Sequence, residues 1–279
     1  MTELRILAYQ ISVPAIRSAA ERDRHLEEVS RKIRSAAEPG QYDLIVLPEL
    51  SSIEYSDAGF EALDQLEEPL AGPSYDTFSD LARHLKAAVV YGFPHRGPKG
   101  RHISQGVMGP DGGLIGRYDK LHIAGGTRTG ETPHFVPGNH ILVFEINGIR
   151  IAPLICYDLR FAPLADRLRE AGVDLVLQCA AQSEEFAFQA WHEMILTRAL
   201  ETEMAWLGLN RAGDGWGRSI WMAGGRSMAD AQTLDEGEQS WSLTLSVNAL
   251  INARTGSNLG PQRRPDYAAI PIKEYKHGG

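Results

Sequence analysis

The sequence predicts an α/β fold in which helices and mixed β-sheets form stacked layers. Short apolar runs typical of buried strands alternate with segments in which apolar residues recur at helical spacing. An Asp-Gly pair at 111–112 and an Asn-Gly pair at 147–148 lie between apolar stretches. They predict antiparallel hairpins, because both pairs favour the positive φ angles of tight turns. Strand–helix units combined with hairpins indicate mixed sheets.

The first half of the chain predicts strands that alternate with helices. Leu26, Val29 and Ile33 recur at helical spacing among charged residues, and Pro39 with Gly40 ends that pattern. The run after Asp43 is continuously apolar, which is typical of a strand covered on both faces. The predicted elements are a strand over 4–11, a helix over 18–37, a strand over 43–48, a helix over 74–86 and a strand over 87–93.

The second half predicts two hairpins followed by further strand–helix units. The elements are hairpins over 104–118 and 141–156, a helix over 161–171, a strand over 173–178, a helix over 184–203, and strands over 205–210, 222–229 and 241–247. Between the hairpins, the segment 123–137 is irregular and rich in Gly and Thr, and long loops of this kind are often functional. No repeat or low-complexity linker divides the chain, so we predict one domain over 1–279.

The composition excludes several classes of protein and of partner. With 43% hydrophobic and 23% charged residues, the 279-residue chain is typical of a globular protein. Its formal net charge of −8, without a Lys/Arg-dense run, argues against a nucleic-acid partner. No apolar run approaches the roughly 20 residues that span a bilayer, and the N-terminus lacks a signal segment. We therefore expect no membrane partner and a cytoplasmic protein in which Cys156 and Cys179 are reduced.

Three chemically complementary side chains lie at the ends of predicted strands. Glu49 follows the strand over 43–48, Lys120 follows the first hairpin, and Cys156 ends the second. In open α/β sheets, reactive groups gather at strand ends. A thiol that attacks an acyl carbon needs a base, a donor for the oxyanion and an acid for the leaving nitrogen. We expect burial to raise the pKa of the carboxyl group and the ammonium to lower the pKa of the thiol.

In their sequence contexts, these residues resemble the nitrilase or carbon-nitrogen hydrolase superfamily. The resemblance covers nearly the whole chain. Its motifs, which occur in the family's order, lie at 47–49, 119–122, 130–138, 155–161, 198–201, 210–213 and 225–230. The resemblance implies a four-layer αββα sandwich, no cofactor, and a homodimer or larger homo-oligomer. The histidines show no metal-ligand spacing, so we also predict no metal.

The resemblance implies a mechanism for the hydrolysis of a small-molecule amide. Cys156 is expected to attack the carbonyl carbon while Lys120 and the N–H of Tyr157 bind the oxyanion. Glu49 is expected to move the proton so that ammonia or an amine leaves and a thioester remains. It is then expected to activate the water that releases the acid, while Glu131 orients Lys120 or the substrate.

The residues around Cys156 indicate a branch of the superfamily. The segment 156–161 is similar to ω-amidase-like enzymes, which hydrolyse the terminal amide of short dicarboxylic monoamides, so we favour an amide over a nitrile. Arg160 then has two interpretations: it pairs with a substrate carboxylate, or it braces the loop through an ion pair. Hydrolysis of N-carbamoyl amino acids, or of N-carbamoyl amines, by the same triad is an alternative.

Two other classes of function stay open. A cysteine–histidine hydrolase would use His122 or His134 as its base and would keep substantial activity without Glu49. A non-catalytic member of the superfamily would act as a binding or assembly module. The walls of the substrate pocket are expected from residues 51–58, 123–132 and 182–188, whose arrangement the sequence does not determine.

Overall fold

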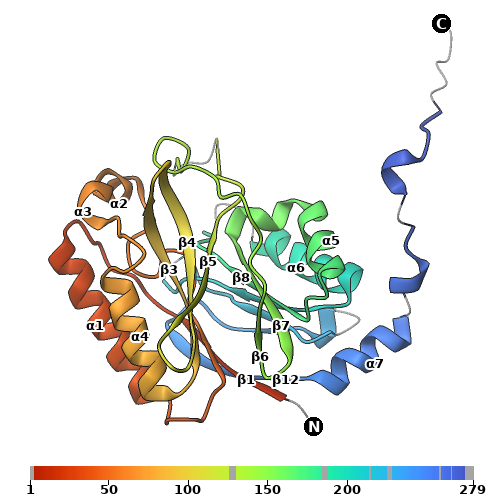
Figure 1. The fold of residues 1–279 in the computed structure, drawn as a ribbon, viewed down its shortest axis with the longest axis horizontal. Helices are drawn as coiled ribbons and strands as arrows, with labels where there is room; N and C mark the ends of the chain where they lie inside the picture. The colour runs from red at the N-terminus through yellow and green to blue at the C-terminus, as the bar shows by residue number, and fades with distance from the viewer. Residues whose placement is uncertain are drawn as a thin grey trace, which may run out of the picture.

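Two mixed β-sheets packed face to face, with helices on both outer faces, form the four-layer αββα sandwich that was predicted. The computed structural model describes residues 3–125, 130–183, 188–213, 215–224, 228–257, 259–264 and 266–273. Helices α1 (Ala19–Ala36) and α4 (Pro73–Leu85) cover one sheet, and α5 (Ala162–Glu170) and α6 (Phe188–Thr202) cover the other (Figure 1).

The first sheet has the strand order β12-β1-β2-β3-β4-β5. Strands β1, β2 and β3 run parallel, and the other neighbours pair antiparallel. Along β1, Leu4 and Ile6 pack between the sheets, whereas Leu7 packs beneath the helices, so both faces are apolar. The strands are β12 (Gln239–Ser246), β1 (Glu3–Gln10), β2 (Leu44–Val46), β3 (Ala88–Gly97), β4 (Gly100–Met108) and β5 (Leu114–Asp119).

The second sheet has the strand order β11-β10-β9-β8-β7-β6. Its three central strands β7, β8 and β9 run parallel and are linked through α5 and α6, whereas the outer pairs are antiparallel. The parallel core of each sheet therefore ends at a row of strand termini. The strands are β11 (Gln232–Thr233), β10 (Ile220–Met222), β9 (Ala205–Leu209), β8 (Leu175–Cys179), β7 (Ile149–Ile155) and β6 (Phe144–Ile146).

Helices α1 and α4 begin and end within one residue of the predicted bounds. Ser18 caps α1 by accepting a hydrogen bond from the N–H of Glu21, while the Glu21 side chain accepts one from the N–H of Ser18. Helix α4 begins at Pro73, whose missing N–H is harmless in the first turn, and ends at Lys86, which has a φ of 53°. None of the helices in the described ranges is long and apolar enough to cross a membrane.

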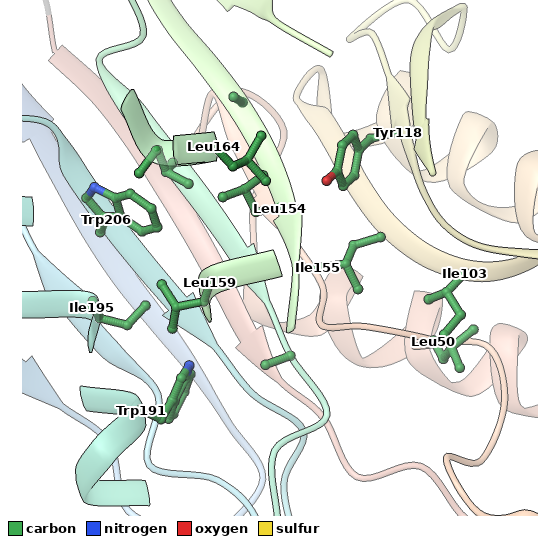
Figure 2. Packing of buried hydrophobic residues seen from close by; sticks show 14 of the residues in the cluster. Leu50, Ile103, Tyr118, Leu154, Ile155, Leu159, Leu164, Trp191, Ile195 and Trp206 are labelled. Carbon is green, nitrogen blue, oxygen red and sulfur yellow. The ribbon is translucent and has the colours of Figure 1, made fainter. Parts of the chain in front are cut away.

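One apolar cluster links the outer helices to the strand ends. Figure 2 shows Trp191 and Ile195 of α6 and Trp206 of β9 beside Leu159. The same cluster includes residues that adjoin the predicted catalytic side chains in the sequence. These are Leu50, Leu121 and Ile155. Tight packing of the neighbouring residues fixes the backbone from which the functional groups project.

Some sequence predictions were wrong or incomplete. The predicted strand over 222–229 ends at Met222, because Gly224 has a φ of 77°, and residues 228–230 form a 3₁₀ turn; residues 225–227 lie outside the described part of the chain. Strands β3 and β4 extend through a hairpin at Gly97 and Gly100 that was not predicted. Helices α2 (Asp57–Glu61), α3 (Leu63–Leu66) and α7 (Val247–Ser257) were also missed. The first four residues of the helix predicted over 184–203 lie outside the described residues.

Candidate active site

Strand ends from both sheets bring Glu49, Lys120 and Cys156 together. Glu49 lies beyond the end of β2, Lys120 follows β5, and Cys156 follows β7. The Lys120 Nζ lies 2.8 Å from Glu49 Oε1, and both side chains are fully buried. The charges of Glu49 and Lys120 also act on the Cys156 thiol. Three residues that are far apart in the sequence thus share one buried site.

The Glu49 carboxylate is held from two directions. Its Oε1 accepts the hydrogen bond from Lys120, and its Oε2 accepts one of 2.8 Å from the N–H of Ala181, which lies just beyond β8. Burial raises the pKa of Glu49, and the Lys120 ammonium opposes this rise only in part. The direction agrees with the expectation from sequence. A carboxylate with a raised pKa is a stronger base for a thiol proton.

Gly92 on β3 makes room for the turn that carries Glu49. A Cβ on Gly92 would lie 2.4 Å from the Leu50 N and 2.5 Å from the Pro48 O, which are backbone atoms. We expect Gly92→Ala to lower the free energy of unfolding by about 3 kcal/mol and kcat by about tenfold, because the turn must shift. Chemical denaturation and steady-state kinetics measure both effects.

Gly237→Ala is the matched control for that substitution, since a Cβ there would meet nothing within 4 Å. If Gly92→Ala were as stable and as active as this control, the close contact between Gly92 and the backbone of the Glu49 turn would not be needed for stability or activity.

Lys120 lies between two carboxylates. Its Nζ is 2.6 Å from Glu131 Oε1, which also accepts a 2.6 Å hydrogen bond from the Tyr55 hydroxyl. Glu131 Oε2 accepts a hydrogen bond from the N–H of Ala124. Burial lowers the pKa of Lys120, but the charges of Glu49 and Glu131 outweigh burial, and the pKa is raised. Lys120 is therefore an ammonium at neutral pH, which suits a hydrogen-bond donor and not a base.

Cys156 begins the 3₁₀ helix η1 (Cys156–Arg160) in a strained conformation. Its φ of 42° lies in the left-handed region, which side chains with a Cβ rarely adopt. The Gln178 Nε2 donates to the Cys156 carbonyl oxygen at 3.0 Å, and the Trp191 indole donates to Gln178 Oε1 at 2.9 Å. These contacts hold the turn that presents the thiol at the end of the strand.

Lys120 lowers the pKa of the Cys156 thiol, as expected, but it does not decide the net direction. Burial and the charge of Glu49 raise the pKa of the thiol, and Lys120 offsets this rise only in part. The site holds two carboxylates, Glu49 and Glu131, for one ammonium, so a thiolate would add further negative charge to a buried cluster. The resting Cys156 side chain is therefore a neutral thiol, which would need a base to become a nucleophile.

Asp158 ties the turn of the second sheet to the Lys120 segment of the first. Its Oδ2 accepts hydrogen bonds from the Tyr118 hydroxyl at 2.7 Å and from the N–H of Ile155 at 3.1 Å. Its Oδ1 accepts one from the N–H of His122 at 3.0 Å and lies 2.8 Å from His122 Nδ1. Since Tyr118 and His122 flank Lys120, this carboxylate fixes the spacing between ammonium and thiol.

Comparison with known proteins identifies the family. Residues 5–245 match the family model described as "Carbon-nitrogen hydrolase". The chain belongs to the carbon-nitrogen hydrolase family. It is thus an enzyme that hydrolyses carbon–nitrogen bonds other than peptide bonds, and the resemblance stated from its motifs is confirmed.

Relatives and solved structures agree with this family. The omega-amidase NIT2 of Homo sapiens is 25% identical over 290 aligned positions, which cover 98% of this chain and 100% of the relative. A CN-hydrolase superfamily protein of Xanthomonas campestris, XC1258, is 26% identical with a TM-score of 0.77, covering 99% of this chain and 100% of its own. Nit3 of Saccharomyces cerevisiae shares the fold at 22% identity, with a TM-score of 0.83 and coverage of 94% and 97%.

Tyr157 and Arg160 lie beside the nucleophile turn of this carbon-nitrogen hydrolase. Arg160 is exposed, and its guanidinium carbon lies 5.6 Å from the centroid of the Tyr157 ring. The rings of Tyr157 and Phe161 pack in a T-shaped arrangement. The Phe161 ring also stacks on His122, at a centroid distance of 3.6 Å. Within the described ranges no ion pair involves Arg160, so the bracing role considered from sequence has no partner there.

Neither histidine considered as an alternative base pairs with Cys156 in the described part of this hydrolase. The His122 Nδ1 is bound to Asp158, and the ring of His134 packs against Phe60 at a centroid distance of 5.6 Å. The described residues also contain no group of three or more His, Cys, Asp or Glu side chains that are placed to hold a metal.

Sequence reasoning missed the supporting roles of Tyr55, Asp158 and Gln178. Tyr55 lies in the segment 51–58 that was expected to form a pocket wall, but its bond to Glu131 has no sequence signal. Asp158 lies in the turn after β7, where a polar residue is common, so its role had no sequence signal. A polar residue inside the apolar run over 173–178 was the one available hint for Gln178.

Proposed function

We propose that this carbon-nitrogen hydrolase is an amidase that converts a small linear amide and water into a carboxylic acid and ammonia through a thioester on Cys156. The observation that carries the proposal is the buried Lys120 ammonium, held at 2.8 Å and 2.6 Å by Glu49 and Glu131 beside a neutral thiol. This arrangement supplies a base, an oxyanion donor and a nucleophile in one site.

Acylation begins when Glu49 takes the proton of the Cys156 thiol as the sulfur attacks the carbonyl carbon. Negative charge develops on the carbonyl oxygen, where Lys120 and the N–H of Tyr157 stabilise it. The protonated Glu49 then gives its proton to the amide nitrogen. The carbon–nitrogen bond breaks, ammonia leaves, and the acyl group stays on the sulfur as a thioester.

Deacylation reuses the same groups. Glu49 is again a carboxylate and takes a proton from a water molecule, whose oxygen attacks the thioester carbon. The carbon–sulfur bond breaks, Cys156 recovers a proton from Glu49, and the acid is released. Throughout, Glu131 with Tyr55 keeps Lys120 directed at the oxyanion position.

For the substrate, we propose a short dicarboxylic monoamide, with N-carbamoyl amino acids as the alternative. Both substrates carry a carboxylate. Arg160 is exposed and has no ion-pair partner among the described residues, so its planar guanidinium can donate two hydrogen bonds to that carboxylate. The omega-amidase named among the relatives supports the monoamide.

Ammonia release by the purified protein tests this function. The panel contains dicarboxylic monoamides, neutral aliphatic and aromatic amides, N-carbamoyl amino acids and a nitrile. We expect activity on carboxylate-bearing amides and none in Cys156→Ala. Activity that survived in Cys156→Ala would contradict the thiol mechanism, and silence across the whole panel would favour a non-catalytic member of the family.

Arg160→Gln tests the carboxylate anchor separately. We expect KM for a dicarboxylic monoamide to rise about 10- to 100-fold, because a charge-assisted bidentate pair is lost, with little change in kcat. The KM for a neutral amide of similar length should stay within about twofold, since it makes no such pair. An equal change for both substrates would show that Arg160 does not recognise the carboxylate.

A further inference from the structure

The motif at 210–213 has no role in the proposed mechanism. Its first residue, Asn210, is fully buried and bonds the segment that contacts Glu49. Asn210 follows β9 directly and has no exposed surface. Its Oδ1 accepts a 2.8 Å hydrogen bond from the N–H of Gln182, and its Nδ2 donates to the Gln182 carbonyl oxygen at 2.8 Å and to the Gly217 carbonyl oxygen at 2.9 Å. The side-chain amide thus pairs with both backbone groups of one residue.

This pairing prolongs the ladder between β8 and β9. The backbone ladder of these parallel strands ends with the N–H of Ala180, which donates to the Leu209 carbonyl oxygen at 2.8 Å. Two residues later the N–H of Gln182 also points toward β9. The strand has ended there, and the side-chain amide of Asn210 accepts the hydrogen bond in place of a backbone carbonyl group. In an extended segment successive N–H groups point to opposite sides. The N–H of Ala181 therefore faces away from β9, where it meets Glu49 Oε2 at 2.8 Å.

We propose that Asn210 is a positioning residue that directs the N–H of Ala181 at the catalytic carboxylate by continuing the β8–β9 ladder through its side chain. The inference rests on the proposed role of Glu49 as the base. Asn210 touches no reacting atom; it acts through the segment 180–182.

A pH profile separates this role from simple structural support. The hydrogen bond from Ala181 lowers the pKa of Glu49, so its loss raises that pKa further. Asn210→Ala removes none of the ionisable groups that interact with Glu49. These groups are Tyr55, Lys120, Glu131, Cys156, Cys179 and Arg211.

The experiment measures kcat/KM against pH for Asn210→Ala and Asn210→Ser. The Ser variant is less disruptive, but its hydroxyl is too short to pair with both the N–H and the carbonyl oxygen of Gln182. We expect the acid limb to move to higher pH by about one unit and kcat to fall about tenfold in both variants. Ser219→Ala is the matched control. Its hydroxyl accepts from the N–H of Asn210 at 2.9 Å and donates to Gln10 but does not bond Gln182, so its acid limb should stay in place.

Alkylation of Cys156 by iodoacetamide gives a second readout that needs no substrate. The rate follows formation of the Cys156 thiolate, and the N–H of Ala181 lowers the pKa of Cys156 as well as that of Glu49, so its displacement should move this profile to higher pH too; Cys156→Ala supplies the background. If wild type hydrolyses no amide but the alkylation profile shifts in Asn210→Ala, the proposed function fails and the positioning role stands. An unmoved profile in folded Asn210→Ala or Asn210→Ser, whatever the activity of wild type, would overturn the positioning role.

Discussion

Substituting Glu49 by Gln lowers kcat by about 10³-fold, the loss expected when a general base is removed. The amide oxygen of Gln can still accept the hydrogen bond from Lys120, but the amide NH2 group cannot accept the second bond from the N–H of Ala181, so a modest loss of stability should accompany the loss of kcat. The amide cannot take the proton of Cys156. In wild type, burial and the charge of Glu49 raise the pKa of this thiol, so that it is neutral at rest. Single-turnover kinetics should place the loss in acylation.

The same substitution separates the proposed mechanism from a cysteine–histidine hydrolase. Such an enzyme would keep most of its rate in Glu49→Gln and would lose it in His122→Asn or His134→Asn. In our account His134→Asn stays close to wild type, because among the described residues the His134 ring packs against Phe60 and not against the site. Retention of more than about a tenth of the wild-type kcat in Glu49→Gln would contradict the assignment of the base.

Removal of the Lys120 ammonium has the largest expected effect on stability. Lys120→Met leaves Glu49 and Glu131 buried without their shared cation, and we expect the free energy of unfolding to fall by about 3–5 kcal/mol at neutral pH. We also expect kcat to fall by about 10²- to 10³-fold, because the oxyanion loses its charged donor. Chemical denaturation measures the first effect, and exposed Lys99→Met is the control.

The stability loss in Lys120→Met should grow with pH. Burial already raises the pKa of Glu49, and the Lys120 ammonium makes the largest contribution that opposes this rise, ahead of the hydrogen bond from Ala181. A carboxyl group with a raised pKa in the folded state holds a proton that the unfolded chain has released, so stability falls as pH increases through that range. The deficit should be smaller at about pH 5 than at about pH 8.

Lys120→Met with Glu131→Gln should be more stable than Lys120→Met alone, because one buried charge is gone. A deficit that is equal at both pH values, or a double variant that is no better than the single one, would show that the carboxylates do not carry the loss.

Strand ends explain why the meeting of these three side chains was predictable from the sequence. Glu49, Lys120 and Cys156 each follow a predicted strand, and both sheets place these strand ends at one edge of the sandwich. The layers were predictable for the same reason, since buried parallel strands are apolar on both faces. Turn chemistry placed the hairpin at Asn147, whose φ is 50°.

Contacts between distant loops explain what was not predictable. The hydroxyl of Tyr55 reaches Glu131, and Asp158 joins His122 across the two sheets, although neither pair has a pattern in the sequence. The net direction of the Cys156 pKa shift was not predictable, because it depends on burial of the sulfur and on the number of buried charges around it. Sequence order indicated a neighbouring cation, whereas the fold surrounds the thiol with two carboxylates and one ammonium.

The thioester on Cys156 is the central claim, and mass spectrometry of the acid-quenched enzyme tests it most directly. Wild type is mixed with excess dicarboxylic monoamide, quenched during turnover and digested with protease. The account predicts that the peptide containing Cys156 gains the mass of the acyl group less one hydrogen, and that Cys156→Ala shows no adduct. Turnover of the amide with an unmodified Cys156 peptide at every quench time, or an adduct on another residue, would contradict the account.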